Sequence, residues 1–124
     1  MLTVILASKR QDVLAPFIEA LQNDEEVALE TTELATEVIQ KIGEKSLQLV
    51  IIDYHLSDLA PLDLAKEILQ INALTNIAVV STMTEDDFHE ATEGLGLLPR
   101  LPSPPLAADA SVLLQRLREV LGIA

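Results

Sequence analysis

The chain has 124 residues, of which 49% are hydrophobic, so we expect one domain over residues 1–124 with a substantial core. Eight Lys and Arg oppose 20 Asp and Glu, and the net charge of −12 excludes unaided binding to nucleic acids or anionic membranes. The absence of cysteine excludes disulfides and thiol chemistry, and the N-terminus lacks the features of a signal or spanning segment, which predicts a cytoplasmic protein.

Short apolar runs alternate with segments of helical periodicity. Residues 2–7 are apolar and rich in β-branched side chains, which predicts a strand, and the polar turn 8–11 follows as its exit loop. From Asp12 to Leu21, apolar residues recur at helical spacing, which predicts a helix. A short edge strand is predicted over 27–31, and a helix over 34–42.

The stretch Leu49–Ile52 carries the clearest signal. Its four large apolar residues, without polar alternation, are typical of a strand buried on both faces, and the run ends at Asp53. Residues 77–80 repeat the pattern and end at Ser81 and Thr82. Because parallel strands end at a common edge, we expect Asp53 and Thr82 on the same rim of a sheet.

The loop after Asp53 contains the start signals of the next helix. Ser57 or Asp58 is placed to cap this helix, and Pro61 suits its first turn. We expect the helix over residues 62–69, whose apolar positions recur at helical spacing.

The C-terminal third supplies two more helices and a weak strand. The acidic residues 84–87 predict a helix start, because negative charge there suits the helix dipole. Residues 97–102 are predicted as an edge strand, since Pro99 and Pro102 remove donors from the ladder. A final helix is predicted over 112–121.

Five strands alternating with five helices predict an α/β fold with a doubly wound, five-stranded parallel sheet in the order 2-1-3-4-5, a flavodoxin-like arrangement. This order brings four loop tips to one edge. The predicted site comprises the residues at these tips: Ser8, Lys9, Asp53, His55, Thr82, Ser103 and Pro104. No glycine-rich phosphate loop follows the first strand, and no histidine base accompanies Ser8 or Ser103, so we expect no enzyme activity.

With these features the chain resembles the receiver domain of bacterial response regulators (CheY-like). The resemblance is strongest in 49–53, in 79–82 and at Ser103-Pro104, and the fold that it implies covers almost every residue. It implies that Asp53 is the phosphoacceptor for a sensor histidine kinase and that Thr82 contacts the phosphoryl group. It also implies a cis Ser103–Pro104 bond.

The sequence departs from the receiver pattern at the charged positions. Receiver domains hold Mg²⁺ with two acidic residues after the first strand, and here these positions are Ser8 and Lys9. The lysine that precedes the proline is replaced by Ser103, and the aromatic switch position is Arg100. Because Mg²⁺ requires oxygen ligands, we expect it to bind at Asp53 only weakly.

We therefore predict that the ammonium of Lys9 pairs with Asp53 in place of the metal. Two function classes remain open: a phosphorylated two-component signalling receiver, and a degenerate pseudo-receiver that serves as a constitutive protein-interaction module. In both classes the output is a protein-binding surface formed by the helix after residue 84, the strand at 97–102 and the helix at 112–121. The same surface is the predicted homodimer interface, where Arg116 and Arg118 face acidic residues across a twofold: Asp86, Asp87 and Glu90.

Overall fold

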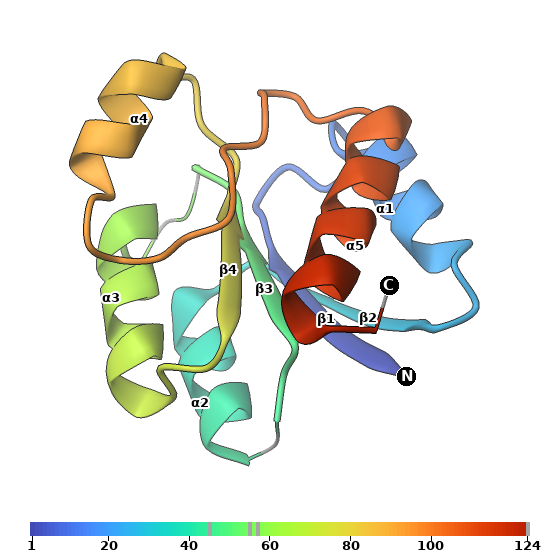
Figure 1. The fold of residues 1–124 in the computed structure, drawn as a ribbon, viewed down its shortest axis with the longest axis horizontal. Helices are drawn as coiled ribbons and strands as arrows, with labels where there is room; N and C mark the ends of the chain where they lie inside the picture. Colours follow the sequence, from blue (N-terminus) through green and yellow to red (C-terminus); the bar gives the residue numbers. More distant parts are fainter. Residues whose placement is uncertain (45, 55, 57, 124) are drawn as a thin grey trace.

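The computed structural model describes residues 1–124 except Lys45, His55, Ser57 and Ala124. Strands and helices alternate along the described chain as far as α4, and α5 follows α4 directly. The elements are β1 (Leu2–Ala7), α1 (Ala15–Gln22), β2 (Val27–Thr32), α2 (Ala35–Glu44), β3 (Leu49–Ile52), α3 (Pro61–Ile71), β4 (Asn76–Val79), α4 (Glu85–Ala91) and α5 (Ala107–Leu121). The strands form a parallel sheet in the order β2-β1-β3-β4 (Figure 1). Among the described residues, no helix combines the length and apolar character needed to cross a bilayer.

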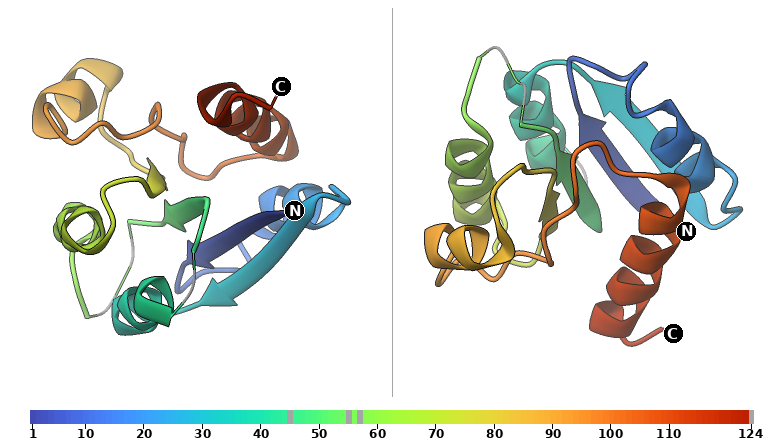
Figure 2. Two further views of the ribbon diagram at one scale, coloured as in Figure 1. Left: turned by 60° about the horizontal axis from the view of Figure 1, so that its bottom comes forward. Right: turned by 90° about the horizontal axis from the view of Figure 1, so that it is seen from above.

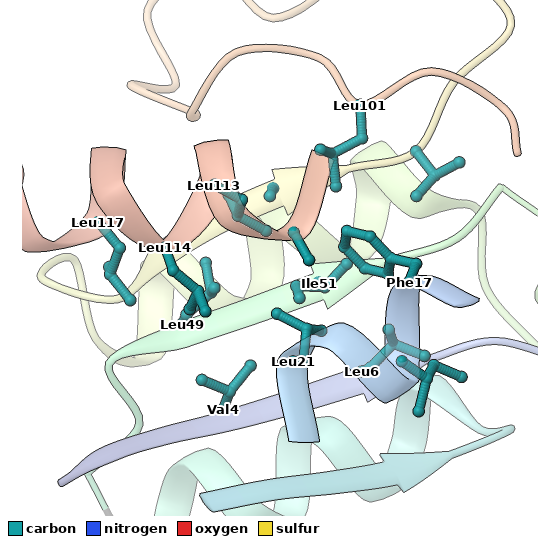
Figure 3. Close-up of a cluster of buried hydrophobic side chains, with 14 of the residues drawn as sticks. Val4, Leu6, Phe17, Leu21, Leu49, Ile51, Leu101, Leu113, Leu114 and Leu117 are labelled. Carbon is teal, nitrogen blue, oxygen red and sulfur yellow. The ribbon is translucent and has the colours of Figure 1, made fainter. Parts of the chain in front are cut away.

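Helices cover the sheet on both faces. α1 and α5 lie on one side and α2 and α3 on the other (Figure 2). Leu6 and Ile51 point toward α1 and α5, where they join Phe17 and Leu117 in one apolar cluster (Figure 3). The next residue along, such as Ile52, belongs to the cluster on the opposite face. The alternation explains why the central strands are apolar at every position.

The register aligns the carboxyl ends of three strands. Ala7 of β1 pairs with Ile52 of β3, and Ile52 pairs with Val79 of β4. The chain therefore leaves all three strands at the same edge of the sheet, and the residues that follow, Ser8 and Asp53 among them, lie on one rim. This geometry confirms the expected convergence of these loop tips.

The prediction of a fifth strand over residues 97–102 is wrong, because these residues do not form a regular strand. In the described structure, residues 97–102 make one parallel bridge to the sheet, between Leu101 and Val80. Pro99 and Pro102 interrupt the segment because they have no N–H to donate. Two of its other amides still bond to the sheet: Leu98 N to Ile77 O at 2.9 Å and Leu101 N to Val79 O at 3.0 Å. The segment runs beside β4, where the fifth strand was expected (Figure 1).

The helix starts also differ from the predicted ones. Asp58 does not cap α3: its carboxylate accepts from Ala35 N at 3.0 Å and Thr36 N at 3.2 Å, so it caps α2. α3 begins with the expected Pro61 in its first turn but without a side-chain cap. Ser57, the other predicted cap, lies outside the described residues. α5 begins at Ala107, five residues earlier than predicted.

Candidate functional site

Asp53 is the centre of the rim. It follows β3 directly, it is fully buried, and its amide donates to Ala7 O at 2.9 Å. Oδ2 accepts hydrogen bonds from Ser8 Oγ at 2.7 Å and Arg10 Nε at 2.8 Å. Oδ1 accepts from Arg10 Nη2 at 3.0 Å and from Tyr54 N at 2.8 Å. Each carboxylate oxygen thus receives two donors from the described residues.

The guanidinium of Arg10 joins three loop tips. Its Nε and Nη2 grip the two oxygens of Asp53 in a bidentate pair, the geometry that favours Arg over Lys opposite a carboxylate. Nη2 also donates to Ser103 Oγ at 2.7 Å. The guanidinium carbon lies 4.4 Å from the centroid of the Tyr54 ring, which is cation–π distance. One side chain therefore connects the ends of β1, β3 and the segment before α5.

The predicted ion pair between Lys9 and Asp53 is wrong. Lys9 is exposed, and the cation that faces Asp53 is Arg10. Because side chains alternate in direction as the chain leaves β1, Ser8 and Arg10 turn inward and Lys9 turns outward. The amide of Arg10 donates to Ser8 Oγ at 3.0 Å and fixes this turn. The alternation was a signal in the sequence that could have selected Arg10.

The environment of Asp53 keeps it ionised. Burial by itself would raise the pKa of Asp53, but the hydrogen bonds from Arg10 and Ser8, the charge of Arg10 and the bond from the Tyr54 amide outweigh burial. The pKa of Asp53 therefore lies below its usual value. The pKa of Arg10 is raised, chiefly by its hydrogen bond to Asp53.

Thr82 and Ser103 occupy different places in the site. Thr82 is exposed and lines an apolar hollow of about 310 Å³ beside Tyr54 and Phe88, and it makes no hydrogen bond to the described atoms of Asp53. Ser103 reaches the carboxylate through Arg10. The Ser103–Pro104 bond is cis, as predicted. His55, another predicted rim residue, lies outside the described residues.

Two other arginines make contacts that the sequence did not reveal. Arg100, which the resemblance to receiver domains places at the aromatic switch position, donates from Nη1 to Ser81 O at 3.2 Å. Its Nε is buried without a hydrogen-bond partner among the described residues. Arg118 lies 2.8 Å from Asp24 and 3.8 Å from Glu26. The charge of Arg118 is thus paired within the chain, and its predicted contact with acidic residues of a second copy stays a prediction.

The residues at this rim do not fit a divalent cation. Both oxygens of Asp53 are engaged, and the hydroxyl of Ser8 donates to one of them. A fixed positive charge, Arg10, lies against the carboxylate that a metal would need. No group of three or more His, Cys, Asp or Glu in the described part of the chain is arranged to hold a metal ion.

Comparisons with known proteins identify the fold. The sequence matches no protein-family model and no curated protein. A response regulator receiver domain protein from Clostridium thermocellum superposes with a TM-score of 0.81 at 20% identity, covering 98% of both chains. The chemotaxis response regulator CheY4 of Vibrio cholerae has a TM-score of 0.81 at 18% identity, covering 94% of this chain and 98% of that one. A CheY-like receiver domain protein from Methanospirillum hungatei has a TM-score of 0.81 at 15% identity, over 96% and 95% of the two chains. The chain thus has the α/β fold of response regulator receiver domains.

Proposed function

We propose that this chain is a receiver-type signalling module that acts by binding other proteins and does so without phosphorylation of Asp53. The fold supports the signalling role, because structures of this fold include response regulator receivers. One observation supports the absence of phosphorylation: hydrogen bonds from Arg10, Ser8 and the Tyr54 amide occupy both oxygens of the Asp53 carboxylate.

The saturated carboxylate is a poor nucleophile. A phosphoacceptor must present an oxygen to the phosphorus atom, and the transfer depends on cations that cancel the charge of the phosphoryl oxygens. Here each oxygen of Asp53 already accepts two hydrogen bonds, and the cation is consumed in holding it. Releasing Arg10 to serve a phosphoryl group would leave a buried charge unpaired.

A phosphorylated receiver is the second candidate. Two positions favour it, since Asp53 follows β3 directly and Thr82 lies on the rim of the same sheet. The two candidates differ in one measurable property, the formation of an aspartyl phosphate at Asp53.

Intact-mass spectrometry after incubation with acetyl phosphate and Mg²⁺ tests the proposal. We expect the wild-type chain to remain unmodified, while a receiver domain with the acidic pair and the lysine, treated in parallel, gains one phosphoryl group. Asp53→Asn serves as the matched control for labelling at other sites. Rapid, stoichiometric labelling that Asp53→Asn abolishes would establish the second candidate instead.

The binding surface that we propose lies on α4, residues 97–102 and α5. On α5, Val112 and Val120 are 67% and 55% exposed, which leaves apolar side chains on the outer side of this helix. Arg116 and Glu119 lie between them in the sequence and are also exposed. In two antiparallel copies of α5, Arg116 of one copy faces Glu119 of the other, a self-complementary arrangement that suits a twofold. A signalling protein such as a sensor kinase is the alternative occupant.

Light scattering coupled to gel filtration tests this surface. We expect a dimer that Val112→Asp converts to a monomer, because the substitution places a charge within the apolar part of the interface. Leu34→Asp is the matched control, since Leu34 is 39% exposed and directly precedes α2, which covers the opposite face of the sheet from α5. A wild-type mass that stays monomeric at high concentration would rule out the homodimer.

A further inference from the structure

We infer that Arg10 is the built-in cation of this rim and that it excludes Mg²⁺ from the site. The inference rests on the proposed function and extends it from phosphorylation to metal binding. It assigns to Arg10 a role that receiver domains divide between a bound metal and a lysine.

The guanidinium spans the positions of both missing groups. Nη2 lies 2.7 Å from Ser103 Oγ, and Ser103 stands where the receiver pattern has its lysine. Nε donates to the same oxygen of Asp53 as Ser8, which stands at a position where the pattern has an acidic residue. One side chain therefore supplies positive charge at both places.

The oxygen atoms that a metal would use are already engaged. Both oxygens of Asp53 accept two hydrogen bonds each from the described residues. Ser8 Oγ donates to Asp53 and accepts from the amide of Arg10 at 3.0 Å. A divalent cation would have to break several of these bonds and to lie a few ångströms from a fixed positive charge.

Arg10 is held in place on several sides. Its side chain is 19% exposed, it stacks on Tyr54 at 4.4 Å, and it bonds to Asp53 and Ser103. A guanidinium does not lose its proton in the accessible pH range. A rise in pH therefore does not release the site to a metal, as it would for a site closed by a histidine.

Tyr54 provides a direct reporter of the site. It is the only tyrosine in the sequence, and the sequence has no tryptophan. Because its ring stacks on Arg10, we expect an ion that displaces the guanidinium to change the tyrosine fluorescence. A titration of the wild-type chain with MgCl₂, without any phosphodonor, should give no saturable change in this signal or in the amide resonances of Ser8 and Asp53.

Three variants make the test decisive. Arg10→Gln removes the charge but keeps an amide donor, and Ser8→Asp combined with Arg10→Ala adds an acidic ligand as well. We expect both to bind Mg²⁺ saturably, at concentrations about tenfold or more below the highest at which the wild type still shows no saturable binding, because a like charge next to the metal is removed. Arg118→Ala is the matched control, since it deletes an arginine paired with an aspartate elsewhere, and it should behave as the wild type does.

The outcomes separate this inference from the proposed function. Saturable Mg²⁺ binding to the wild type at Asp53 overturns the inference, and so does the absence of Mg²⁺ binding in the Arg10 variants. If the double variant does not fold, Arg10→Gln by itself gives the answer. A wild type that excludes Mg²⁺ and still takes phosphate supports the inference and overturns the proposed function. A wild type that binds Mg²⁺ but takes no phosphate overturns the inference and supports the proposed function.

Discussion

Two arginine–aspartate pairs of this chain have the same contact distance in different surroundings. Arg10 and Asp53 approach to 2.8 Å, and so do Arg118 and Asp24. The side chain of Asp53 is fully buried, whereas those of Arg118 and Asp24 are 22% and 24% exposed. We call Arg10–Asp53 the inner pair and Arg118–Asp24 the outer pair. Water can replace either partner of the outer pair, but it cannot easily reach Asp53. Distance alone therefore does not determine what an ion pair contributes.

The same contrast appears in the titration of the two carboxylates. The pKa of Asp24 is lowered chiefly by its hydrogen bond from Arg118. The pKa of Asp53 is lowered although burial works in the opposite direction, so its partners must first offset the cost of desolvation. The pair of Arg10 and Asp53 thus offsets the cost of burying a carboxylate, whereas the pair of Arg118 and Asp24 has less desolvation to offset, because Asp24 stays in contact with water.

Removal of each arginine gives the largest difference between the pairs. We expect Arg10→Ala to lower the free energy of unfolding by about 3 kcal/mol, because it leaves the Asp53 carboxylate buried without its cation. Arg118→Ala should cost less than about 1 kcal/mol, as is usual for a pair whose partners both stay in contact with water. Urea denaturation followed by circular dichroism at neutral pH measures both values. Equal losses in the two variants would contradict the comparison.

The pH dependence of the Arg10→Ala loss should show the charge of Asp53 directly. The folded-state pKa of Asp53 lies below the ordinary value of about 3.9, so the pair contributes fully above that value. The contribution is lost as the pH falls through the folded-state pKa, because the carboxylate becomes protonated. In Arg10→Ala, burial instead penalises the charged form, and protonation relieves the penalty.

The difference in unfolding free energy between wild type and Arg10→Ala should therefore be constant near neutral pH and shrink on acidification, by at most about 1.4 kcal/mol per pH unit per proton. Urea midpoints in a series of buffers from neutral to acidic pH measure it. The corresponding difference for Arg118→Ala should stay small throughout. A loss for Arg10→Ala that stays undiminished below the folded-state pKa of Asp53, which lies under the ordinary value, would show that its origin is not the charge of Asp53.

Ser8 and Ser103 both bond to the inner pair. Removing the more deeply buried hydroxyl, that of Ser8, should again lower the free energy of unfolding more, although both losses are smaller than that of Arg10→Ala. Ser8 is fully buried and donates to a charged oxygen, so Ser8→Ala should cost about 2 kcal/mol. Ser103 is half-buried and accepts from Arg10, whose guanidinium has other partners, so Ser103→Ala should cost about 0.5–1 kcal/mol. Urea denaturation of the two variants side by side gives the order, and the reverse order would show that the bond between Arg10 and Ser103 contributes more to stability than the bond between Ser8 and Asp53.

Much of the fold could be predicted from short-range patterns. The runs 49–52 and 77–80 are apolar at every position because both faces of the sheet are covered, and this property is visible in the sequence. The placement of Asp53 at the end of a buried strand follows from the same pattern. Residues 97–102 were predicted as an edge strand because two prolines remove donors from the ladder, but the missing donors left a single bridge instead of a strand.

The partners of the polar side chains could not be predicted in this way. Asp58 was expected to cap the helix that follows it, and it caps a helix 23 residues earlier in the chain. The cation at Asp53 was expected to be Lys9, and it is the next residue, Arg10, which contacts a carboxylate 43 residues away. A cap or an ion pair forms wherever the folded backbone brings donor and acceptor together.

The sequence by itself therefore determined the order of β1 to β4 in the sheet, the two faces of the sheet that helices cover and the rim on which Asp53 lies. These features depend on hydrophobic periodicity, which involves neighbouring residues. The tertiary structure decided which cation meets that carboxylate. Alternation after β1 and the bidentate geometry of a guanidinium both favour Arg10 over Lys9, but the carboxylate that Arg10 contacts comes from a distant strand. The choice of Arg10 depends on the turn after β1 and on the approach of β3 and Ser103, and these contacts exist only once the sheet is assembled.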